Sequence, residues 1–195
     1  MSTPRRDTPT FPARIAAGTT FTRKSRRVVV QRIVDRHLLK VAAVEGEPLP
    51  MPFMHRTEAR DLAYDDAARA IVEHVVQRYR NGALAGDTID RIRPFCRTVE
   101  AGGPATGEGV VSFFNDIGVP LPRRMADALP HAFLYGNLSL DDGWVEAYTT
   151  SRARYALDVV LHVAQQMRAV EKERMDQVVE AMCATASPRG VALLL

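Results

Sequence analysis

Apolar residues recur at helical spacing in several stretches of the chain, and glycine or proline residues separate these stretches. This spacing predicts helices in four stretches, at residues 65–80, 87–96, 108–117 and 122–135. The pair Asn81-Gly82 directly follows the first stretch and is typical of a helix C-terminus. The pattern therefore favours a mainly helical protein.

The longest helical pattern runs from residue 139 to residue 185. An unbroken helix of this length would be on the order of 65–70 Å long, which exceeds the width of a small domain. Two structures satisfy the pattern. Either the helix breaks near the charged segment 171–174, or its end is an arm that leaves the body.

The segment from residue 28 to residue 44 supports two interpretations. Six of its residues recur at helical spacing, with Ser25 as a plausible N-cap: Val30, Ile33, Val34, His37, Leu38 and Val41. The β-branched run Val28-Val29-Val30 leaves a pair of strands open as the alternative. We expect the helix and leave the strands open.

These patterns predict an all-α fold, with a single irregular helical domain and extended N- and C-terminal arms. The expected boundaries are a basic N-terminal arm at residues 1–27, a helical core at 28–170, and a C-terminal helix end and arm at 171–195. Prolines dispersed along the chain argue against a simple up-down bundle.

The charge of the chain is distributed unevenly. The 195 residues carry a net charge of +3, but residues 1–27 hold seven arginine and lysine side chains against Asp7 alone, a net charge of +6. Such an arm typically meets a polyanion or an acidic neighbour. The candidate assembly residues of the arm are Arg23, Lys24, Arg26 and Arg27.

Signatures of other classes of protein are absent from the sequence. It has no glycine-rich phosphate loop, GxSxG or HExxH motif, and its five histidines are scattered. We therefore expect no catalysis, no cofactor and no metal. No apolar run is long enough to span a bilayer, and the N-terminus does not look like a secretory signal. Two cysteines without CxxC spacing, Cys96 and Cys183, suit a reducing cytosol.

Arginines that could bind nucleic acid gather in the middle of the sequence. Arg91, Arg93 and Arg97 fall on or beside one predicted helix, and Arg123 and Arg124 follow. Guanidinium groups match phosphate oxygens in pairs, and the neighbouring Phe95 could stack on a base. Salt bridges to acids of the body are the alternative role for any one of these arginines.

The segment Ile92-Arg93-Pro94-Phe95-Cys96-Arg97 resembles the Cys-Arg motif of coat proteins from flexible filamentous plant RNA viruses, such as the potexviruses, carlaviruses and closteroviruses. Downstream segments follow in the same order as in that family. They are Phe113-Phe114-Asn115, the turn Gly118-Val119-Pro120-Leu121-Pro122, the aromatic segment 132–137, and Thr149-Thr150-Ser151-Arg152. The match covers roughly residues 65–165.

This resemblance implies an all-α coat protein whose arms connect neighbouring subunits of a filament around one single-stranded RNA. Arg97 takes the position of the family's RNA-binding arginine, Thr88 that of a preceding serine, and Asp141 that of a displaced acidic residue. The implied partners are single-stranded RNA and further copies of the chain, with no membrane. The implied locations are the virion and the host cytoplasm.

Residues and resemblance together predict sequence-independent packaging of RNA by its backbone, in a helical filament that assembles through head-to-tail contacts. The alternative is a helical DNA-binding regulator of plasmid or phage type. Its basic arm would enter the minor groove, and its long helix would form a dimer seam.

Overall fold

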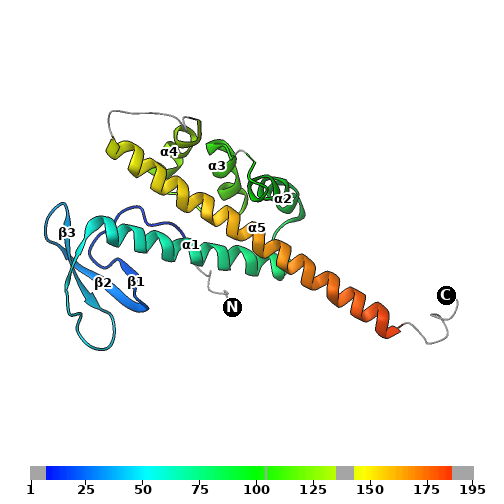
Figure 1. Cartoon of the computed structure of the whole chain (residues 1–195), viewed down its shortest axis with the longest axis horizontal. Coiled ribbons are helices and arrows are strands. Elements are labelled where there is room, and N and C mark those ends of the chain that lie inside the picture. The colour runs from blue at the N-terminus through cyan, green and yellow to red at the C-terminus, as the bar shows by residue number, and fades with distance from the viewer. Residues whose placement is uncertain (1–7, 104, 135–142, 186–195) are drawn as a thin grey trace, which may run out of the picture.

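The computed structural model describes residues 8–103, 105–134 and 143–185, and it describes their side chains except at 130–134, 143–154 and 185. A small sheet comes first along the chain and helices follow (Figure 1). The strands are β1 (Thr20–Arg23), β2 (Arg26–Ile33), β3 (Leu38–Ala43) and β4 (Phe53–His55). The helices are α1 (Arg56–Arg80), α2 (Gly86–Glu100), α3 (Gly107–Asp116), α4 (Arg123–Leu134) and α5 (Gly143–Thr185).

The expected all-α fold is wrong, because residues 20–55 form a four-stranded antiparallel sheet with strand order β1-β2-β3-β4. The β-branched run of β2 alternates across this sheet, so that Val28 and Val30 are buried. Lys24 and Ser25 form the turn between β1 and β2, and both have positive φ, which matches the right-handed twist of a hairpin. Ser25 is therefore a turn residue and not a helix cap.

The segment expected as an extended N-terminal arm is part of the folded body. Phe11, Ile15 and Phe21 are at most 5% exposed. Phe11 stacks on Tyr64 of α1 with ring centroids 5.4 Å apart, and it also meets Phe114 of α3 at 5.9 Å. These three buried side chains therefore attach residues 8–27 to the body.

Helix α1 joins two hydrophobic cores. Its first turns, with Ala59 and Ala63, cover the inner face of the sheet. The rest of α1 packs on α5 and contributes Ile71, Val75 and Tyr79 to the core of the helical part. The helix ends at Asn81, and Gly82 follows with a φ of +67°, as the sequence predicted.

Helix α5 is continuous over 43 residues, which corresponds to about 65 Å. It does not break at 171–174. Tyr155 to Val170 contribute buried residues to the core, whereas the end of the helix runs beyond the other elements (Figure 1). No helix within the described residues is apolar enough over sufficient length to cross a membrane.

Candidate nucleic-acid interface

The arginines predicted on α2 are mostly engaged within the protein. Arg91 pairs with Asp87 and Asp116, each at 3.1 Å, and the hydrogen bond to Asp87 is the main cause of its raised pKa. Arg93 pairs with Glu171 of α5 at 2.9 Å, and its Nη2 donates to the Tyr79 hydroxyl at 3.3 Å. Arg91 and Arg93 therefore form internal salt bridges, which was the expected alternative to binding nucleic acid.

The remaining predicted residues on α2 differ in exposure. Thr88 is only 8% exposed, so its hydroxyl is not presented to a long polymer. Arg97 is exposed and has no ion-pair partner in the described part of the chain, but its surroundings carry both charges, with Glu100, Arg168 and Glu171 beside it. The face of α2 is therefore not a continuous cationic surface.

The predicted residues of the N-terminal arm lie in the β1–β2 hairpin. Arg23 pairs with Glu58 of α1 at 3.1 Å, and Lys24 sits in the turn. Arg26 donates to the carbonyl of Glu47 at 2.5 Å, and Arg27 donates to the Thr20 hydroxyl at 3.1 Å. Three of the four cations thus stabilise the sheet and its contact with α1.

The last three predicted residues are dispersed. Arg123 begins α4, is 96% exposed and lies 3.9 Å from Asp127. Arg124, the next residue of α4, lines a cleft at the start of α1. Asp141 lies outside the described residues.

This cleft gathers arginine side chains from several parts of the fold, and we call it the basic cleft. Its volume is about 240 Å³, and no aspartate or glutamate lines it. Its charged and ionisable lining residues come from five parts of the fold, and they are Arg14, Arg36, His37, His55, Arg56, Arg60 and Arg124. Five guanidinium groups around one small cleft make it suited to binding an anion.

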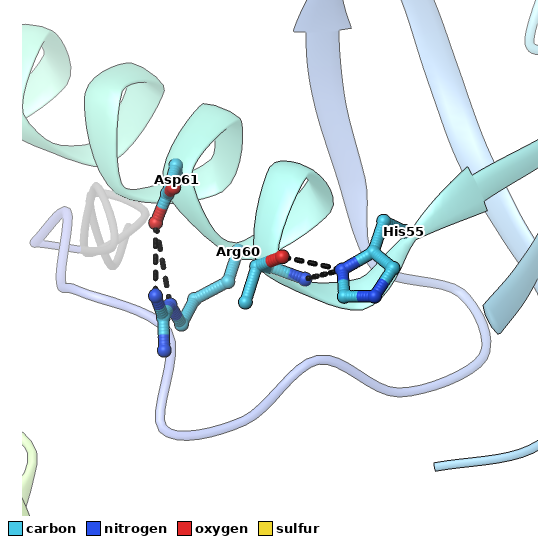
Figure 2. Close-up of polar contacts among 4 residues, drawn as sticks. His55, Arg60 and Asp61 are labelled. Carbon is cyan, nitrogen blue, oxygen red and sulfur yellow. Dashed lines mark hydrogen bonds and ion pairs between the residues drawn. The ribbon is translucent and has the colours of Figure 1, made fainter. Parts of the chain in front are cut away.

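Local structure holds each part of the basic cleft in place. Arg56 is the first residue of α1. Arg60, which Figure 2 shows, follows one turn later. His55 caps the helix, since its ring nitrogen accepts from the backbone N–H of Thr57. The N-terminal end of α1 adds partial positive charge to the same place. Phe11 and Ile15 anchor the segment that carries Arg14, and the β2–β3 turn carries Arg36 and His37.

Little within the described residues neutralises the basic cleft. Arg60 pairs with Asp61 at 3.2 Å (Figure 2). Arg56 donates only to the carbonyl of Ile15 at 3.4 Å, and Arg36 donates to the Nε2 of His37 at 2.7 Å. Neither arginine forms an ion pair with a carboxylate in the described part of the chain, although the neighbouring Asp35 interacts electrostatically with Arg36. Arg14 and Arg124 likewise form no ion pair there. The cleft therefore retains most of its positive charge for a ligand.

The two histidines of the basic cleft stack on each other, with ring centroids 5.8 Å apart and an angle of 22° between the planes. The pair presents flat aromatic surface beside the guanidinium groups.

A second hollow lies between α1 and α5 and has a volume of about 570 Å³. Asp158 and His162, which lie one turn apart on α5, both line it. The Nδ1 atom of His162 is within 2.7 Å of the backbone carbonyl of Asp158. No group of three or more potential metal ligands occurs among the described residues.

Cys96 is not an activated nucleophile. It is buried next to Glu100, and burial raises the pKa of its thiol to about 12. The thiol therefore stays protonated at neutral pH, and Cys96 serves as a small apolar residue in the core.

Sequence reasoning found Arg124 but missed the other residues of the basic cleft. Only Arg56 and Arg60 carry a local signal, because they lie four residues apart next to a helix start. A comparison of the chain with protein-family models, with curated proteins and with solved structures found no match.

Proposed function

We propose that this chain is a non-catalytic subunit that binds the phosphate backbone of single-stranded RNA in the basic cleft and coats the RNA together with further copies of itself. The observation that carries the proposal is the cleft lined by five arginines and by no acidic residue. Arginine side chains bind phosphate oxygens in pairs, and contacts to the phosphate backbone read no base sequence. This chemistry suits a protein that covers RNA of any sequence.

The distribution of cations around the basic cleft suits a polymeric anion. Its lining residues come from the N-terminal segment, the β2–β3 turn, the end of β4, the start of α1 and α4, so the cations lie on several sides of the cleft. A strand that passes through can place successive phosphates near different arginines. Affinity would then come from several modest contacts and not from one tight site.

A salt titration tests backbone binding. Neutralising about five phosphates of a single strand predicts a slope of about −3.5 in a plot of log affinity against log salt concentration. Affinity for an oligouridylate should then fall about a hundredfold between about 50 and about 200 mM salt. Fluorescence anisotropy with a labelled oligonucleotide measures this. A slope near zero, or tight binding to one duplex DNA sequence alone, would contradict the proposal.

The projecting end of α5 supports assembly from copies of the chain. It carries four large apolar side chains that are 51–66% exposed, namely Met175, Val178, Val179 and Met182. They continue the face of α5 on which Arg168 and Glu171 contact α2, past the point where α2 ends. A neighbouring copy that packs there would form a head-to-tail contact, which propagates into a filament when it does not close.

Charged substitutions on this helix end test its role in assembly. The double variant Met175→Lys, Val178→Lys should leave the monomer folded, because both side chains are exposed. It should abolish filaments formed with RNA in electron micrographs, because each head-to-tail contact would then bury two lysine charges, which is costly. Gln177→Lys, Glu180→Lys is the control on exposed polar positions of the same segment. Filaments of normal length from the first variant would contradict this role.

A further inference from the structure

A strip of the outer sheet surface runs away from the basic cleft along β3 and β4. Phe53 and His55 lie two residues apart on β4, and Met54 between them is buried. The register pairs Phe53 with Lys40 and His55 with Leu38. Because paired residues share a face, Phe53, Lys40 and His55 lie on the outer face of the sheet. We call these three residues the outer strip.

The outer strip combines an exposed ring with further positive charge. Phe53 is 41% exposed. Lys40 lies opposite it on β3, and Arg32 lies opposite Lys40 on β2, so a cation-rich row crosses the sheet beside the ring. His55 belongs both to this strip and to the basic cleft. The strip is thus continuous with the cleft and has the same sign of charge.

The spacing of the rings favours an unstacked strand. Two residues along a β-strand are about 6.6 Å apart. This is about twice the 3.4 Å rise per nucleotide of a strand whose bases are stacked in a duplex. Rings at this spacing can receive consecutive bases of an extended single strand, whereas a duplex keeps its bases stacked on each other.

Resting on the proposed function, we propose that the outer strip is a base-binding site, in which unpaired bases stack on Phe53 and on the His37–His55 pair while the backbone lies along Lys40 and the basic cleft. Stacking on an aromatic ring tolerates any base, because every base has a flat π-face. The site therefore adds affinity for single strands without adding sequence preference. It distinguishes unpaired nucleic acid from duplexes and from other polyanions.

The test compares two probes of equal length and charge, an oligodeoxythymidylate and an abasic oligodeoxynucleotide. The wild-type chain should bind the probe with bases about tenfold more tightly. Phe53→Ala should remove most of this difference and leave the affinity for the abasic probe unchanged. Phe53→Tyr keeps the ring and should behave like the wild type. Met51→Ala removes a neighbouring side chain that is 64% exposed, and serves as the apolar control.

The outcomes separate the base-binding site from the proposed function. If Phe53→Ala weakens both probes equally, or neither, the outer strip does not bind bases, whereas backbone binding in the basic cleft stands. If Phe53→Ala changes only filament formation, the ring belongs to a contact between copies and the inference is overturned. If the wild type binds neither probe at low salt, the proposed function itself fails.

Discussion

Replacing Arg36 and Arg124 with glutamine should lower the affinity for a single-stranded RNA oligonucleotide about fiftyfold at about 50 mM salt. Both side chains line the basic cleft, and neither forms an ion pair with a carboxylate in the described part of the chain, although Asp35 interacts electrostatically with Arg36. Each lost phosphate contact removes about 0.7 from the salt slope, so the slope should become shallower by about 1.4. Anisotropy titrations at several salt concentrations measure both quantities.

The matched control is the double variant Arg97→Gln, Arg168→Gln, which removes the same charge from the face of α2 and α5. Arg97 has an exposed but mixed-charge environment, and Arg168 pairs with Glu100 at 2.7 Å. We expect less than about a threefold change in affinity, because only long-range charge is lost. If the control variant lost affinity and the cleft variant kept it, RNA would bind along α2 and the basic cleft would have another role.

The cleft variant should be as stable as the wild type. Arg36 and Arg124 are exposed, and exposed cations contribute little to the free energy of unfolding. Thermal unfolding of the variant should therefore coincide with that of the wild type, within about 2 °C. Lost RNA binding can then be assigned to the missing guanidinium groups and not to a damaged fold.

The second large effect is expected at Phe11, where alanine should lower the free energy of unfolding by about 3 kcal/mol. The ring is 3% exposed and lies between Tyr64 of α1 and Phe114 of α3. Its removal leaves a cavity between these elements, and the surrounding structure relaxes only partly to fill it. Denaturant unfolding followed by circular dichroism measures the loss.

Phe11→Leu is the conservative control and should cost about 1 kcal/mol, because most of the apolar volume remains. The pair of variants distinguishes two roles for the N-terminal segment. In an arm that attaches to another subunit, Phe11→Ala would leave the monomer's stability unchanged and affect only assembly. That result would contradict the packing of residues 8–27 on the body.

Helical periodicity predicted much of the helical part of this protein. The stretch 65–80, its stop at Asn81-Gly82, and the helices near 87–96, 108–117 and 122–135 all correspond to observed elements. These helices are amphipathic and separated by glycine or proline, so local sequence determines where most of them end. Helix α5 also continues through 171–174, where the guanidinium group of Arg174 lies 5.3 Å from the ring centroid of Tyr79.

The sheet was missed for identifiable reasons. Residues 28–41 fit a period of 3.6 as well as a period of 2, and the turn Lys24-Ser25 lacks the glycine or asparagine that signals a hairpin. The prolines and positive charge of the first 27 residues also indicated an extended arm, although Phe11, Ile15 and Phe21 supply enough apolar surface to anchor it. The average composition of a segment does not reveal a few apolar residues that become buried.

The basic cleft could not have been predicted from the sequence. Its arginines come from residues 14 to 124, and only the packing of the N-terminal segment, the β2–β3 turn, α1 and α4 brings them together. Conversely, Arg91 and Arg93 look available in the sequence but are paired with Asp116 and Glu171, which are distant along the chain. The cations can be counted in the sequence, but which of them are neutralised by carboxylates depends on how the chain folds.

Ultraviolet cross-linking of the intact chain to oligouridylate, followed by mass spectrometry of the cross-linked peptides, tests the central claim most directly. Binding in the basic cleft and on the outer strip predicts cross-links within residues 32–40 and 53–60, and their disappearance in the Arg36→Gln, Arg124→Gln variant. Cross-links confined to residues 91–97, or none at low salt, would contradict it.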